Sequence, residues 1–182
     1  MSNGDTWPVL RSGDLTLRVL APEDADAFLA GEDDEQRRWL WYDASRHSTR
    51  ETVEDAIRRW RASWAAGGPV HQWGVFRGAG AVLVGGVELR DRGDGFANVS
   101  YVVFPAARRQ GVATAAARIA SRWALENMNV DAVVAIVNPT NLASLGVLRR
   151  AGFVSDGMAE SAEHDSPEEM RRFVLAGPQP PR

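Results

Sequence analysis

The sequence predicts an α/β protein in which helices pack against a layered sheet. Some runs alternate apolar and polar residues, as a half-buried strand does, whereas others repeat apolar residues every three or four positions, as an amphipathic helix does. In chain order they predict a strand, two helices, three strands, a helix, a strand, a helix and two strands, without an internal repeat. The chain of 182 residues suits a single domain, 1–182, with an ordered core from about 14 to 176. Loose ends are expected on either side of that core, at 1–13 and 177–182.

The first strand and two helices occupy the N-terminal third. Alternation from Leu15 to Val19 predicts the strand. Pro22 is typical of the first turn of a helix, and Gly31 is expected to end that helix. The spacing Ser48-x-x-Glu51 is a capping-box pattern and predicts the second helix. Its apolar face is expected to bury four residues before the helix ends at Gly67-Gly68-Pro69: Val53, Ile57, Trp60 and Trp64.

The remaining strands and helices follow at short intervals. Strands are predicted at 72–77, 81–90, 97–104 and 132–137. One helix follows the third of these strands, with Val112, Ala116, Ile119 and Trp123 on its apolar face. Another helix contains Leu142, Leu145 and Leu148 and is expected to end at Gly152. A closing hairpin is predicted from 153–159 and 170–175.

Composition excludes several classes of function. A net charge of −3 and a pI near 5.6 argue against a general nucleic-acid-binding protein, which normally carries a basic face. The absence of cysteine excludes disulfides, thiolate metal sites and a cysteine nucleophile, and the three histidines lack metal-ligand spacing. No apolar run approaches the roughly 20 residues of a membrane span, and the N-terminus lacks a signal-peptide pattern. We therefore expect a cytoplasmic protein without a metal or a membrane partner.

A short turn between a predicted strand and a predicted helix is the most informative segment. It reads Arg108-Arg109-Gln110-Gly111-Val112-Ala113-Thr114. The first N–H groups of a helix lack partners within it, and together with the helix dipole and nearby guanidinium groups they form an anion site suited to a pyrophosphate. Gly111 allows close approach of a phosphate to the backbone. An ordinary strand-to-helix turn with two solvated arginines is the alternative.

Two sequence blocks together resemble the GNAT family of N-acetyltransferases. The first block is the run 97–114, which matches the family pattern Arg/Gln-x-x-Gly-x-Gly/Ala at Arg108, Gly111 and Ala113. The second is the run 138–153, which is similar to the Asn-x-x-Ser helix that ends in Gly-Phe. Order and spacing are closest to the ribosomal-protein N-terminal acetyltransferase (Rim-type) branch, and the resemblance extends from about Leu15 to Leu175.

The resemblance implies a fold and a cosubstrate, acetyl-CoA. The fold would be a mixed, mostly antiparallel sheet with helices on both faces and two splayed central parallel strands, here 97–104 and 132–137. Unpaired backbone groups near Val102 and Val103 would bind the pantetheine amides, and a backbone N–H there would stabilise the negative thioester oxygen. The pyrophosphate would be bound by the Arg108 side chain and by the backbone of Arg109, Gln110, Gly111, Val112, Ala113 and Thr114.

The resemblance also suggests roles for the second block. Asn141 would contact the pantetheine arm, and the Ser144 hydroxyl would donate a hydrogen bond to the departing thiolate. The residues themselves allow plainer alternatives, since Asn is a preferred N-cap and Ser144 would then only pack. Many relatives outside this branch use a tyrosine acid, but neither Tyr42 nor Tyr101 lies in the motif.

A base must keep the attacking amine neutral. Glu88, on the strand before the first block, is a candidate through a water, with a solvent-facing strand residue as the alternative. His71, Glu160, Glu163 and His164 are weaker candidates.

The predicted function is acetyl transfer from CoA to a primary amine by direct transfer. The acceptor would be a protein or peptide N-terminus or a small-molecule amine. Acidic runs at 32–35 and 160–169 suit a cationic acceptor, although solvated loops explain them equally well. A non-catalytic acyl-CoA-binding or regulatory module on the same fold is the alternative. The seven tryptophans are compatible with a homodimer, which no sequence feature establishes.

Overall fold

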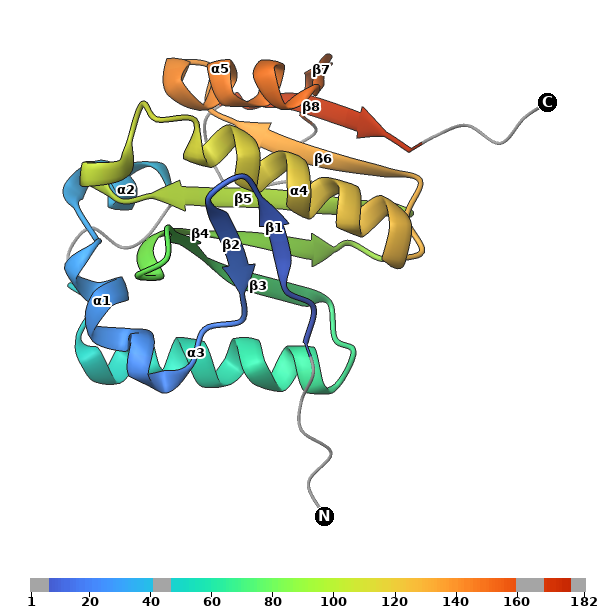
Figure 1. Ribbon diagram of the computed structural model, residues 1–182. Coiled ribbons are helices and arrows are strands. Elements are labelled where there is room, and N and C mark those ends of the chain that lie inside the picture. Colours follow the sequence, from blue (N-terminus) through green and yellow to red (C-terminus); the bar gives the residue numbers. More distant parts are fainter. Residues whose placement is uncertain (1–6, 41–46, 160–168, 178–182) are drawn as a thin grey trace.

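The computed structural model describes residues 7–40, 47–159 and 169–177. Eight strands form one sheet (Figure 1): β1 (Leu10–Ser12), β2 (Leu15–Arg18), β3 (Val70–Arg77), β4 (Val82–Asp91), β5 (Phe96–Val103), β6 (Ala132–Val137), β7 (Val154–Met158) and β8 (Arg171–Ala176). The helices are η1 (Pro22–Asp24), α1 (Ala25–Ala30), α2 (Asp34–Trp39), α3 (Arg50–Ala65), η2 (Pro105–Ala107), α4 (Val112–Asn127) and α5 (Leu142–Ala151). No helix within the described residues is long and apolar enough to cross a membrane.

The sheet is antiparallel except at one central pair. Its strand order is β1-β2-β3-β4-β5-β6-β8-β7, and only β5 and β6 run parallel. The α/β class and the mostly antiparallel sheet that the sequence predicted are therefore confirmed.

The parallel pair separates soon after it begins. Strands β5 and β6 pair at Phe96, Ala97 and Asn98, opposite Ala132, Val133 and Val134. Beyond Asn98, β5 continues to pair with β4 as far as Val103 opposite Gly85, whereas β6 pairs with β8. The C-terminal half of β5 thus has a free side, and the predicted splay is present.

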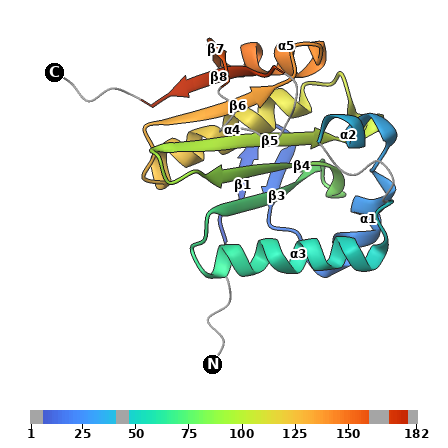
Figure 2. The same ribbon diagram turned by 180° about the vertical axis from the view of Figure 1, so that it is seen from behind.

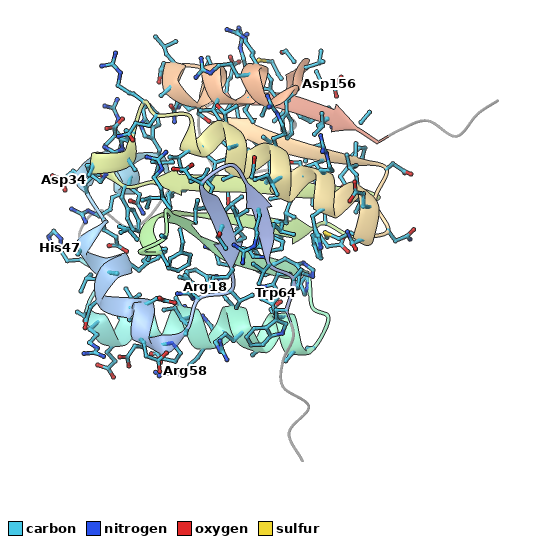
Figure 3. The ribbon with its side chains drawn as sticks, viewed as in Figure 1. Arg18, Asp34, His47, Arg58, Trp64 and Asp156 are labelled. Carbon is cyan, nitrogen blue, oxygen red and sulfur yellow. The ribbon has the colours of Figure 1, made fainter. Side chains whose placement is uncertain are left out.

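Helices cover both faces of the sheet. Side chains alternate across a strand, so Val75 of β3 belongs to one buried cluster and its neighbour Phe76 to another. The larger cluster lies under α4 and α5 and includes Trp64 at the end of α3, whereas the smaller one lies under α1 and the earlier turns of α3. Figure 1 shows α4 crossing in front of the central strands, and Figure 2 shows α3 from the opposite side. On α3, Trp64 is buried and Arg58 points away from the sheet (Figure 3).

Two sequence predictions need correction at the N-terminal side. Residues 1–13 were expected to be loose, but Leu10–Ser12 form β1, which pairs with β2. Such a short strand with exposed residues has no periodicity of its own and depends on its partner. The cap of α3 is Thr49, whose hydroxyl accepts a hydrogen bond from Thr52 N–H, rather than the predicted Ser48 with Glu51. Ser48 instead donates to Glu32 Oε1 at 3.0 Å.

Candidate active site

A cleft of about 720 Å³ opens where β5 and β6 separate. Its walls come from the end of β5, the start of α4, the first turns of α5 and one side of α2. It is lined by most of the residues that the sequence assigned to the cosubstrate: Val102, Val103, Arg108, Arg109, Gly111, Val112, Ala113, Thr114 and Asn141. Ser144 lines it as well. A cavity of this size is in the range of cofactor and ligand sites.

The turn before α4 leaves the helix N-terminus open to the cleft. Arg109 and Gly111 both adopt left-handed backbone conformations, with φ of 61° and 80°. Gly111 is the N-cap and no side chain caps the helix, so the N–H groups of its first turn remain available. A Cβ at Gly111 would meet no atom within 4 Å, so the backbone angle and not crowding favours glycine there.

One backbone N–H of β5 points into the cleft. The carbonyl oxygen of Val102 lies 2.2 Å from where a Cβ of Gly85 would stand, so it is directed toward β4. Since a trans peptide directs its N–H opposite to its carbonyl, the Val103 N–H points away from β4, to the side that β6 has left. The next peptide agrees, because Phe104 N–H donates to Val84 on β4 and leaves the Val103 carbonyl facing the cleft. The backbone donor predicted near these two valines is therefore that of Val103.

The side chain of Arg108 is already engaged by carboxylates. Its Nη atoms bind Asp33 at 2.7 Å and Glu35 at 2.8 Å, and its Nε donates to the Val103 carbonyl at 3.0 Å. The hydrogen bond from Arg108 holds the pKa of Asp33 below its usual value, against the opposing effect of burial. The positive charge of Arg108 is thus compensated by the carboxylates of Asp33 and Glu35.

Gln110 points away from the cleft. Its amide accepts from Arg77 at 2.5 Å and donates to the Ala106 carbonyl at 2.9 Å. Only its backbone is left for a phosphate.

Asn141 and Ser144 lie at the first turn of α5. Asn141 caps the helix, because its Oδ1 accepts from Ser144 N–H at 3.0 Å. The Ser144 Oγ lies 2.8 Å from the hydroxyl of Tyr101 on β5. Burial raises the pKa of Tyr101 to about 12, although the hydrogen bond with Ser144 opposes the rise. The tyrosine therefore stays protonated at ordinary pH and keeps a hydrogen that it can donate.

A second, small cavity adjoins the cleft at Tyr101. It measures about 60 Å³ and shares Gln36, Leu40, Tyr101 and Val102 with the cleft. Glu88 lines it, next to Gln72 on β3 and the aromatic rings of Phe28 and Trp60. Glu88 also accepts from Arg90 at 3.0 Å.

His71 lies elsewhere, so its prediction as a candidate base is wrong. Gln72 lines the small cavity, and its neighbour His71 therefore points to the opposite face of β3. There its ring lies 4.5 Å from Trp64 and 5.3 Å from Trp123, between centroids. Glu160, Glu163 and His164 fall outside the described residues.

Comparison with protein families identifies the scaffold. The acetyltransferase (GNAT) domain model matches residues 14–154. The chain belongs to the GNAT acetyltransferase family. The prediction of an N-acetyltransferase is confirmed at the level of this family. No curated protein matches the chain by sequence.

Solved GNAT structures share the fold at low identity. RimL, a ribosomal L7/L12 alpha-N-protein acetyltransferase in complex with coenzyme A, is 14% identical with a TM-score of 0.80, covering 93% of this chain and 98% of that one. The ribosomal-protein-S5-alanine acetyltransferase from Vibrio fischeri is 16% identical with a TM-score of 0.79, covering 93% and 97%. RimJ from Mycobacterium smegmatis in complex with CoA-disulfide is 20% identical with a TM-score of 0.76, covering 93% and 86%.

Sequence reasoning missed Tyr101, whose hydroxyl lies beside Ser144 in this GNAT site. It is separated from Ser144 by 43 positions, and only the fold brings the two hydroxyls together. The sequence did contain one signal for it. Tyr101 lies two residues before Val103 in β5, and alternate residues of a strand point to the same side.

Proposed function

We propose that this protein transfers the acetyl group of acetyl-CoA directly to a primary amine, at the junction of the two cavities. The cosubstrate occupies the larger cleft, with its pyrophosphate on the first turn of α4 and its thioester near Ser144. The amine enters through the small cavity beside Glu88. The observation that carries the proposal is that Tyr101 lines both cavities and binds Ser144 at the boundary.

The residues at this junction suit an amine attack on a thioester. As the nitrogen–carbon bond forms, the Val103 N–H stabilises the charge on the carbonyl oxygen. Glu88 accepts a proton from the amine through a water. The carbon–sulfur bond then breaks, and the Ser144 hydroxyl donates a hydrogen bond to the thiolate, which later takes a proton from solvent. Tyr101 donates to Ser144 and so directs the serine hydrogen toward sulfur.

The acidity of the amine indicates the acceptor class. The small cavity places one carboxylate, Glu88, on the acceptor side. An α-amine has a pKa of about 7.7–8.0 against about 10.4 for lysine, so it is the easier group for one carboxylate to keep neutral. A peptide N-terminus is therefore the acceptor class that we favour, with small-molecule amines as the second arm of the test.

A thiol-release assay tests the proposal. Purified protein is mixed with acetyl-CoA and a panel of peptides and small amines, and products are identified by mass spectrometry. We expect CoA release that depends on an amine, together with an acetylated product. Binding of CoA without release above background for every amine would overturn the proposal and indicate an acyl-CoA-binding module.

A further inference from the structure

The arginines of the larger cleft differ in what compensates their charge. Three arginines line it: Arg108, Arg109 and Arg150. Arg108 is bound by Asp33 and Glu35. Within the described part of the chain, no carboxylate pairs with Arg109 or Arg150. Among the described residues, Arg109 before α4 and Arg150 near the end of α5 are thus the two arginines of the cleft without a carboxylate partner.

The position of Arg150 depends on a glycine one turn earlier. Side chains of a helix lean toward its N-terminus, so Arg150 extends back over residue 146. A Cβ at Gly146 would lie 3.3 Å from both Nη atoms of Arg150, closer than such contacts normally are. The absent side chain leaves the space in which the guanidinium lies against the helix and faces the cleft. Arg118 of α4 donates to the Arg150 carbonyl and ties this end of α5 to the neighbouring helix.

Acetyl-CoA has one phosphate group that the α4 turn does not bind. Its pyrophosphate suits the N–H groups of that turn and Arg109 beside them. Its third phosphate is attached separately, to the 3′-oxygen of the ribose. We infer that Arg150, placed by Gly146, binds this 3′-phosphate and makes the protein select CoA over its dephosphorylated form. The inference rests on the proposed function, since it requires acetyl-CoA in this cleft.

Calorimetric titration with CoA and with 3′-dephospho-CoA tests the inference. Wild-type protein should bind CoA more tightly than dephospho-CoA by roughly ten- to hundredfold, as expected for a charge-assisted hydrogen bond. Arg150→Met should remove that difference by weakening CoA alone. Arg149→Met is the matched control, because Arg149 is the adjacent exposed arginine of the same turn and does not line the cleft. It should leave both affinities unchanged.

The outcomes separate the two proposals. If the wild type binds neither nucleotide, the proposed function itself is wrong. If it binds both and Arg150→Met weakens both equally, or neither, then the protein still binds CoA and only the role of Arg150 is overturned. Gly146→Leu, which fills the space under the guanidinium, should reproduce the selective loss for CoA, and unchanged affinity in this variant would also contradict the inference.

Discussion

At the scale of single residues, two glycines shape the cosubstrate cleft for different reasons. Position 85 on β4 requires a glycine because the Val102 carbonyl oxygen lies where a side chain would begin. The direction of that carbonyl also fixes the direction of the Val103 N–H. Gly111 has free space around it but a positive φ. The sequence suggested the role of Gly111 from its motif. It could not suggest that of Gly85, whose neighbour is 17 positions away on another strand.

Replacing Gly85 by alanine should damage both stability and cosubstrate binding. The new methyl group would lie 2.2 Å from the Val102 oxygen unless that peptide turned. Overpacking of this kind costs about 1–3 kcal/mol of the free energy of unfolding. Thermal unfolding and CoA titration measure the two effects. Gly80→Ala is the control, since the Cβ there would meet only Val82 at 4.0 Å. Equal behaviour of the two variants would refute the role of Gly85.

A glutamate at Gly111 should abolish CoA binding. The side chain would place a negative charge at the helix N-terminus, where the pyrophosphate is expected. Gly93→Glu is the control for backbone strain. Gly93 has a similar φ of 74° and equally free surroundings but does not line the cleft. Calorimetry should show normal CoA affinity for the Gly93 variant and none for the Gly111 variant. Unchanged affinity at Gly111 would show that the pyrophosphate binds elsewhere.

At the scale of elements, the short helix α2 connects the two cavities. Gln36 of α2 and Leu40, the residue after the helix, line both cavities. Six residues cannot sustain a helix alone, and α2 is held at its N-cap: Asp33 accepts from Gln36 N–H at 2.9 Å and from Arg108. In the sequence, the acidic run 32–35 indicates only a contact for a cationic acceptor or a solvated loop. The Arg108 partner is 75 positions away, so local patterns could not show it.

Substitutions at Asp33 should separate its two contacts. Asn at this position can still cap the helix but lacks the charge that pairs with Arg108, whereas Ala removes both contacts. We expect faster amide hydrogen exchange in residues 34–39 for Asp33→Ala than for Asp33→Asn, with a cap contribution of about 0.5–2 kcal/mol. Equal exchange in the two variants would show that the cap does not hold α2.

The pH dependence of the Asp33 contacts follows from the direction of its pKa shift. Its pKa in the folded protein is lower than 3.8, the ordinary value. The contribution of the charged form is therefore complete above about pH 4 and is lost as the pH falls through the folded pKa. Asp33→Asn should flatten that part of the acid-unfolding curve.

At the scale of the whole molecule, the fold could be predicted from the sequence more completely than the site. Strong local signals, such as the β-branched run of β6 and Gly152 at the end of α5 with φ of 103°, indicated most strands and helices and their order. Their arrangement agrees with the GNAT resemblance. The site depends instead on contacts between distant segments, including Tyr101 with Ser144 and Arg108 with Asp33, which no local pattern contains.

Below neutral pH the whole protein should lose stability through His71. Burial lowers its pKa below 6.5, although the charge of Asp91 opposes the shift. As the pH falls below 6.5 the unfolded chain binds the proton first, so the free energy of unfolding should decrease, by at most about 1.4 kcal/mol per pH unit. Denaturant unfolding at several pH values measures the slope. His71→Phe, which keeps the contacts with the tryptophans, should reduce it, and the exposed His47→Gln should not; identical slopes would exclude His71 as the cause.

Turnover of the Ser144→Ala variant tests whether the thioester is cleaved beside the Tyr101–Ser144 pair. It is measured on an acceptor identified by the thiol-release panel, alongside direct CoA titration. Because the hydrogen bond strengthens as charge develops on sulfur, kcat should fall by about ten- to a thousandfold while the Kd for acetyl-CoA hardly moves. Tyr101→Phe should lower kcat less, by about two- to tenfold, since Ser144 would remain. Full turnover by Ser144→Ala would show that the thiolate leaves without help from Ser144 and that Ser144 is a packing residue of α5.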